Sequence, residues 1–394
     1  MSTSSPIPSP ASGTSHLERE ILQQPAVWRD LAASLRDLDL APFLRPVLDR
    51  PDARILLTGA GTSAYAGQVA APHLTRVLGR RVEPVATTDL VSNPLEILLP
   101  GVPTLLVSFA RSGNSPESLA ACDLADQVLG DVSHLVLTCN PDGALARAHA
   151  DRARSRVVLM PAAADDQSFA MTSSFTSMVL AVLQLLGPDA LADGADDGVE
   201  ALARAAESVL RQRDRVAELA GRVHERVVYL GSGALTGLAR ECSLKLTEVT
   251  AGQVVGLPES SLGYRHGPKA ALTPETLALV LVSSDPYARR YDLDIVAELA
   301  AALPPGQTVA VSAAALADDL GPDVEVVRID LDPTVPDAFL ALPTVLVGQL
   351  LALESAARRG LDPDVPFPGG EVNRVVRGVH IHPLSTSPAE VSPA

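Results

Sequence analysis

Short β-branched runs alternate with longer Ala- and Leu-rich stretches along most of this chain. The short runs predict strands at 54–58, 82–86, 104–108, 134–138 and 157–160, and again at 227–230, 276–282, 308–312 and 324–329. Apolar residues at helical spacing predict helices at 169–186, 198–223 and 335–359, with a loop at 191–198. Strands that alternate with helices are typical of a parallel sheet with crossover helices, so the sequence predicts an α/β fold.

The two series of strands resemble each other. Segments 54–63 and 226–235 both read as a strand, a G-x-G turn and the start of a helix. The separation along the chain from Gly61 to Gly233 nearly equals the separation from Ser108 to Ser283, at another pair of strand ends. This near-constant offset predicts an internal duplication. We therefore expect two tandem, doubly wound, flavodoxin-like parallel-sheet domains whose facing carboxyl edges hold the site.

The predicted domains are 19–215 and 216–384, with disordered tails at 1–18 and 385–394. The 47% hydrophobic and 20% charged residues indicate a folded globular chain, and a net charge of −16 disfavours nucleic acid or an anionic membrane as partner. The three cysteines form no C-x-x-C pair, which suits a reducing compartment. We find no signal peptide and no apolar segment near the roughly 18 uncharged residues of a spanning helix, so we expect a cytoplasmic protein.

The loop GAGTS at 59–63 follows a predicted strand and opens a predicted helix. Gly61 permits close backbone approach, and the first helical amides, with Thr62 and Ser63, are suited to an anion. Ala64 at the third glycine position and Glu83 further on also fit a dinucleotide-binding loop. A nicotinamide-dependent dehydrogenase is therefore an alternative to a protein that binds a phosphate group with this loop. The next loop favours phosphate binding.

That next loop, at 108–118, concentrates short polar side chains at a predicted helix start. Ser112, Asn114 and Ser115 cluster there beside Arg111. Ser115 is also suited to cap the helix, with Pro116 at the first helical position, so capping is the alternative interpretation.

A third hydroxyl-rich segment, TSSFTS at 172–177, includes Ser173 and opens another predicted helix. Capping explains this segment as well as phosphate binding does. Three such segments in one domain nevertheless favour a compact phosphomonoester site made of amides and hydroxyls.

Glu241, Lys245 and Glu248 share one face of a predicted helix, because they are four and three positions apart. A solvated, salt-bridged stripe is the ordinary interpretation, but a carboxylate is also the usual base for moving a proton. His266 lies in a Gly- and Pro-flanked loop and titrates near neutrality. Glu259, earlier in the same segment, is either a second acid or base, or a helix cap.

The sequence predicts no bound metal, since His, Cys and Asp residues nowhere show ligand spacing. We interpret the remaining histidines, including His73, His134 and His224, as structural. The roles of His380 and His382, near the C-terminus, are left open.

Taken together, these motifs resemble the sugar isomerase (SIS) domain family of phosphosugar-binding proteins. The patterns G-x-G-T-S and x-x-S-G-x-[ST] match 59–63 and 110–115. The longer similarity, over residues 20 to 384, is to the branch of tagatose-6-phosphate ketose/aldose isomerases and galactosamine-6-phosphate deaminases. It rests on SFARSGNSPES (108–118), ECSLKLTEVT (241–250), ESSLGYRHGPK (259–269), VSSDPY (282–287) and GEVNRVV (370–376).

The resemblance implies a role for each matched position. Glu248 is the implied isomerisation base, His266 the ring-opening group that reaches a neighbouring subunit, and Glu259 a further acid or base. The implied substrate-binding residues are Gly61, Thr62, Ser63, Arg111, Ser112, Asn114, Ser115, Ser173, Lys245 and Arg377. A late segment closes over the site through Asn373, Arg374 or Arg377, and a homodimer or homotetramer without a cofactor is expected.

The implied reaction converts galactosamine 6-phosphate to tagatose 6-phosphate and ammonia through an enolamine. Aldose–ketose isomerisation of a hexose 6-phosphate, without deamination, is one open alternative. A non-catalytic phosphosugar-binding regulator is another, although sensing requires neither Glu248 nor His266. Asp285 stands in the second domain's loop where the first has small polar residues, and its carboxylate would repel phosphate. The second domain is thus expected to hold no phosphate.

Overall fold

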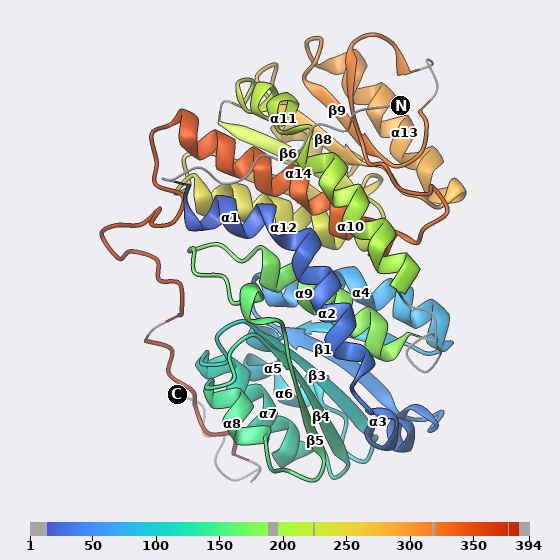
Figure 1. The fold of residues 1–394 in the computed structure, drawn as a ribbon, viewed down its shortest axis with the longest axis vertical. Coiled ribbons are helices and arrows are strands. Elements are labelled where there is room, and N and C mark those ends of the chain that lie inside the picture. The colour runs from blue at the N-terminus through green and yellow to red at the C-terminus, as the bar shows by residue number, and fades with distance from the viewer. Residues whose placement is uncertain (1–13, 188–195, 224, 317–319, 377, 386–394) are drawn as a thin grey trace.

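Two parallel five-stranded sheets organise the chain in the computed structural model, which describes residues 14–187, 196–223, 225–316, 320–376 and 378–385 (Figure 1). The first sheet has the order β2-β1-β3-β4-β5 and the second β10-β9-β8-β6-β7. Counted within its own domain, each sheet therefore has the order 2-1-3-4-5, which is the flavodoxin-like order. The predicted α/β fold with two doubly wound sheets is confirmed. The strands are β1 (Arg54–Gly59), β2 (Val82–Ala86), β3 (Thr104–Ala110), β4 (Val132–Thr138), β5 (Ser155–Leu159), β6 (Arg226–Gly231), β7 (Val255–Glu259), β8 (Leu277–Leu281), β9 (Thr308–Ser312) and β10 (Val324–Arg328).

Helices connect these strands and fill the space between the sheets. They are α1 (His16–Leu22), α2 (Gln24–Arg36), α3 (Ala41–Leu48), α4 (Thr62–Leu78), α5 (Thr87–Ser92), α6 (Pro94–Ile97), α7 (Pro116–Val128), α8 (Ala144–His149), α9 (Ser173–Leu186), α10 (Asp196–Leu210), α11 (Arg213–Ala220), α12 (Ala234–Val249), α13 (Pro286–Ala302) and α14 (Asp337–Arg358). Short 3₁₀ turns are η1 (Ala162–Ala164), η3 (Gly263–Arg265) and η4 (Pro268–Ala271).

Three local features differ from the predictions. Helix α1 begins inside the expected tail, because the Ser15 hydroxyl accepts a hydrogen bond from the Glu18 amide and caps it. The helix expected at 198–223 is divided into α10 and α11. Strand β7 was not predicted, because Gly256 and Pro258 interrupt its pattern; proline is tolerated there since β7 is an edge strand.

One continuous apolar core lies between the two sheets and joins the domains. Helices α4, α9, α12 and α14 form the layer that fills this space in Figure 1. A Cβ atom on Gly237 would lie 2.9 Å from the Gln68 Cβ, so only glycine permits the close crossing of α12 over α4. This crossing places α12, a helix of the second domain, beside the loops of the first.

Helix α14 is a correction to the expectation that no segment approaches the length of a membrane span. Its 22 residues include an apolar window long enough to cross a bilayer by length and composition. However, 89% of that window is buried inside the protein, between the two sheets. Burial on all sides accounts for the apolar composition of this helix.

Candidate active site

A cavity of about 240 Å³ opens at the carboxyl edge of the first sheet. Its walls come from the loops after β1 and β3, the segment before α9, helix α12 and the C-terminal segment. The lining residues are Ala60, Gly61, Thr62, Ser63, Phe109, Ala110, Arg111, Ser112, Gly113, Ser115, Ser118, Phe169, Met171, Lys245, Glu248, Val372, Asn373, Arg374 and Val376. Segments from both domains and from the end of the chain thus meet around one space.

The loop after β1 brings backbone amides and hydroxyls to the cavity. Gly61 is the N-cap of α4 with φ of 55°, a conformation that side chains disfavour, and its counterpart Gly233 caps α12 with φ of 57°. Thr62 and Ser63 follow in the first turn of α4, where the helix dipole favours an anion, and the Ser63 amide donates to the Ala60 carbonyl at 3.1 Å.

The loop after β3 adds a second helix N-terminus. Ser115 is the N-cap of α7 with Pro116 next to it, as the capping interpretation predicts. Its hydroxyl nevertheless makes no capping hydrogen bond within the described chain, and it lines the cavity with Ser112. Ser115 therefore forms the N-cap of the helix with its backbone alone, and its hydroxyl remains available to a ligand.

Asn114 is placed differently from its neighbours in this loop. Its Oδ1 accepts a hydrogen bond of 3.0 Å from the Ala144 amide, at the start of α8. The described cavity wall does not include it. Asn114 caps α8, which corrects the expectation that it faces the substrate.

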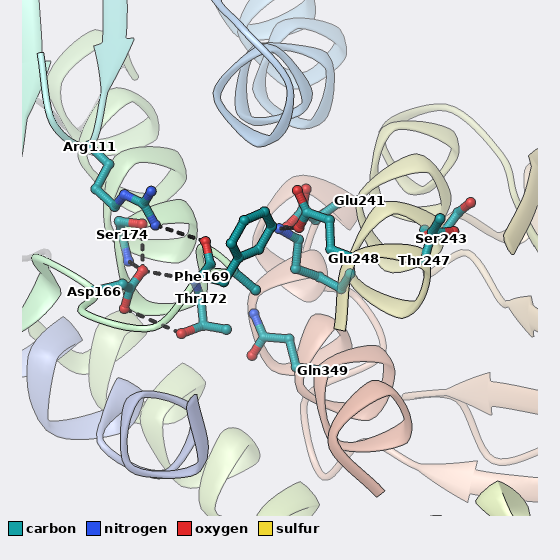
Figure 2. Close-up of polar contacts among 12 residues, drawn as sticks. Arg111, Asp166, Phe169, Thr172, Ser174, Glu241, Ser243, Thr247, Glu248 and Gln349 are labelled. Atoms are coloured by element: carbon teal, nitrogen blue, oxygen red, sulfur yellow. Dashed lines mark hydrogen bonds and ion pairs between the residues drawn. The ribbon is translucent and has the colours of Figure 1, made fainter. Parts of the chain in front are cut away.

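The surroundings of Ser173 also differ from the expectation that this residue faces the substrate. The carboxylate of Asp166 accepts hydrogen bonds from the amides of Thr172, Ser173 and Ser174, at 2.8–3.1 Å, so the N-terminus of α9 already holds an anionic group (Figure 2). The Ser173 hydroxyl donates to the Glu20 carbonyl at 2.7 Å and points away from the cavity wall. Capping, the alternative interpretation, therefore explains this segment.

Arg111 joins two walls of the cavity. It is 7% exposed, and its guanidinium donates to the carbonyl oxygens of Phe169 and Arg374, at 3.3 and 3.2 Å (Figure 2). Burial, together with the nearby Arg374 cation, lowers the pKa of Arg111. The side chain thus fastens the C-terminal segment over the site and adds positive charge to the cavity wall.

Helix α12 supplies a carboxylate held by a buried cation. The Lys245 ammonium donates to Glu248 Oε2 at 2.5 Å and lies 3.7 Å from Glu241 Oε1 (Figure 2). Glu241 and Lys245 are buried, whereas 25% of the Glu248 side chain is exposed, on the cavity wall. The predicted shared face is present, but it faces inward rather than toward solvent.

The two inner members of this trio have shifted pKa values. Burial raises the pKa of Glu241 to about 8, although the Lys245 cation opposes the shift. Burial lowers the pKa of Lys245, but the two carboxylates outweigh burial and the net shift is upward. Lys245 therefore stays charged beside Glu248.

His266 and Glu259 lie outside the cavity of their own chain. His266 is exposed and ends the turn η3 on the second domain. Glu259 ends β7, and its Oε1 accepts from the Ser260 amide at 2.7 Å. Among the closing residues, Asn373 and Arg374 line the cavity, while Arg377 lies outside the described residues, as does His224.

The second domain has a comparable loop whose polar groups are occupied from within. Asp337, at the start of α14, accepts from the Ser283 hydroxyl at 2.6 Å and from the amide and hydroxyl of Ser284 at 2.7 and 2.8 Å. Asp285 instead caps α13. A carboxylate therefore occupies this loop, as expected, but it belongs to Asp337 rather than to Asp285.

The helices that follow the two G-x-G turns also differ between the two domains. His73 and Arg76 of α4 lie beside the loop of the second domain. When Gly61 is aligned with Gly233, these two residues occupy the positions that Lys245 and Glu248 hold in α12. The two domains thus share a helix at this position but not the Lys–Glu pair.

Comparisons with known proteins agree with this geometry. The family model of the SIS domain matches residues 50–187, which contain the first sheet. An AgaS protein of Streptomyces coelicolor is 57% identical to the chain, over 94% of this chain and 96% of that protein. The chain belongs to the AgaS family.

Two further similar proteins have a stated activity or a solved structure. The D-galactosamine-6-phosphate deaminase AgaS of Shewanella sp. ANA-3 is 42% identical, over 93% of this chain and 91% of that protein. The crystal structure of an Escherichia coli tagatose-6-phosphate ketose/aldose isomerase superposes with a TM-score of 0.85, at 37% identity, over 95% of this chain and 99% of that one.

Proposed function

We propose that this protein is a deaminating isomerase that converts D-galactosamine 6-phosphate to D-tagatose 6-phosphate and ammonia. One observation carries the proposal: Glu248 lies on the wall of a cavity whose other wall is built from helix N-termini and hydroxyls. AgaS relatives that are named for this activity and align over almost the whole chain support the same substrate.

The phosphate binds between the N-termini of α4 and α7 in this mechanism. The first amides of these helices and the hydroxyls of Ser63, Ser112 and Ser115 donate to its oxygens, and Arg111 adds positive charge. Such local donors hold a dianion on a chain whose net charge is −16. The sugar carbons then extend toward α12, where Lys245 and Glu248 lie.

Glu248 moves one proton between adjacent carbons. Its carboxylate takes the proton from C2 of the open-chain amino aldose, whose C1 is an aldehyde, and returns it to C1 through an enolamine, which leaves an imine at C2. Water then adds to the resulting C2 imine, and ammonia leaves as the C2 carbonyl of the ketose forms. Lys245 keeps the carboxylate oriented through its contact of 2.5 Å. No cofactor takes part in these steps.

His266 opens the sugar ring from a neighbouring subunit in this proposal. Its position, exposed and outside the cavity of its own chain, supports a role across an interface. The active form is then a homo-oligomer with shared sites. We place it in the cytoplasm, in keeping with the three free, buried cysteines.

The decisive assay incubates the purified protein with hexose and hexosamine 6-phosphates and measures ketose and ammonia separately. We expect equal amounts of ammonia and tagatose 6-phosphate from galactosamine 6-phosphate. Ketose from a hexose 6-phosphate, without ammonia from any hexosamine phosphate, would instead support the second candidate, a simple isomerase like the named Escherichia coli structure. A lack of product from every substrate would refute both.

A further inference from the structure

Three buried side chains converge on the outer face of the first sheet, away from the catalytic cavity. Cys122 comes from α7, His134 from β4 and His149 from the last residue of α8. Each is at most 2% exposed, and one thiol or imidazole atom from each lies within 4.8 Å of the others. The two imidazole rings are 4.7 Å apart between centroids. The structure thus assembles one sulfur and two nitrogen donors from three separate elements.

Each imidazole is oriented by a hydrogen bond through one of its nitrogens. Nε2 of His134 lies 2.8 Å from the Asp126 carboxylate, which accepts, so the proton is on Nε2 and Nδ1 keeps a lone pair. That Nδ1 is buried and has no hydrogen-bond partner among the described residues. Nδ1 of His149 is bonded to the Ser155 hydroxyl at 2.9 Å. Outer carboxylate and hydroxyl partners of this kind orient histidines that bind metal ions.

We propose that Cys122, His134 and His149 bind one borderline-soft divalent cation, for which Zn²⁺ is the reference ion. Thiolate and imidazole are the ligands that zinc prefers, at about 2.3 and 2.0–2.1 Å. Binding forms one metal–sulfur and two metal–nitrogen bonds and releases the thiol proton to solvent. The Ser108 hydroxyl, 3.7 Å from Cys122 Sγ, or a water molecule is suited to the fourth position.

The site would stabilise the support of the phosphate-binding loop. Helix α7 begins directly after Ser115, and α8 is capped by Asn114 from the same loop. A metal that joins α7, β4 and α8 therefore connects the helix that follows this loop with the helix that Asn114 caps. The sequence predicted no metal because the three ligands lack a recognisable spacing, and only the folded sheet brings them together.

The test uses the full-length protein, stripped with a chelator and titrated with Zn²⁺ or Co²⁺. We expect one tightly bound Zn²⁺ per chain, a higher Tm, and a thiolate-to-cobalt charge-transfer band with Co²⁺. Cys122→Ala should abolish the band and the rise in Tm, and Asp126→Asn should weaken Zn²⁺ binding about 10- to 100-fold. Cys139→Ala, which removes another buried cysteine of the first domain, is the matched control and should bind as the wild type does.

His382→Gln is the control for Zn²⁺ binding at the protein surface. His380 and His382 lie near the C-terminus with their rings edge to face and the centroids 4.5 Å apart, so they are a second candidate pair of ligands. This variant should bind Zn²⁺ unchanged. The proposal is wrong if the wild type binds no stoichiometric Zn²⁺, if its cobalt form lacks the charge-transfer band, or if binding follows His382 rather than Cys122. The wild-type cobalt spectrum decides the question even if Cys122→Ala does not fold, and none of these readouts depends on the proposed enzymatic activity.

Discussion

Replacing Glu248 with glutamine tests the proposed base most directly. Glutamine keeps an acceptor oxygen for the Lys245 ammonium, which lies 2.5 Å from Glu248 Oε2, so the side chain should stay in place. What is lost is the ability to take a proton. General acid–base catalysis contributes about 10²- to 10⁴-fold, which corresponds to roughly 2.7–5.5 kcal/mol of transition-state stabilisation at about 1.36 kcal/mol per tenfold change. We therefore expect kcat for Glu248→Gln to fall by about that factor.

Substrate binding should survive this change, because in our proposal the loops after β1 and β3, rather than α12, hold the phosphate. A thermal-unfolding assay with galactosamine 6-phosphate measures this separately. Ligand at 100 times Kd adds about 2.7 kcal/mol to the stability of the folded state, and Glu248→Gln should show a shift close to that of the wild type. Glu275→Gln, a change of the same kind at an exposed position outside the cavity, is the control for turnover.

Two results would contradict this reasoning. If Glu248→Gln retains turnover within tenfold of the wild type, another group carries the proton. If the variant loses the ligand-induced rise in Tm as well as turnover, Glu248 contributes to binding, and the division between phosphate loops and catalytic helix is wrong.

Three other experiments test separate parts of the site. Ser115→Ala should raise KM about 10- to 100-fold by removing a hydrogen bond to a charged group, while its Tm stays nearly unchanged. Asn114→Ala should instead lower the stability of the folded state by about 1 kcal/mol through loss of a helix cap. Steady-state kinetics and thermal unfolding of both variants distinguish the two roles. The folded-state pKa of about 8 for Glu241 lies above its ordinary value of 4.5, so stability from the bound proton is present below pH 4.5 and lost as pH rises to 8. Glu241→Gln should therefore flatten that decline, and identical pH profiles of Tm would contradict it. Mixing His266→Ala with Glu248→Gln, two variants of low activity, should restore part of the activity if sites are shared between subunits. No recovery after subunit exchange would refute sharing.

Local sequence was sufficient for the regular parts of this molecule. The alternation of β-branched runs with helices predicted two doubly wound sheets, because strand and helix periodicities are properties of neighbouring residues. The spacing of Glu241, Lys245 and Glu248 likewise predicted one helical face. Edge strand β7 was missed, since Gly256 and Pro258 remove the signal that a central strand would show.

Tertiary structure decided which polar residues reach the cavity. The starts of α7 and α9 are both rich in hydroxyl residues in the sequence. The Asp166 carboxylate accepts hydrogen bonds from the first amides of α9, whereas the N-terminus of α7 has no side-chain cap among the described residues. Asp166 lies only six to eight residues before the amides it caps, so this capping is local in the sequence. The meeting of Cys122, His134 and His149 does not follow from spacing, because these three side chains come together only in the folded structure. The sequence by itself thus predicted most of the strands, the two similar doubly wound domains and the shared helical face of Glu241, Lys245 and Glu248. Burial and hydrogen bonding within the folded chain decided which hydroxyls remain open to the cavity, because a donor already bonded within the protein has nothing left to offer a ligand.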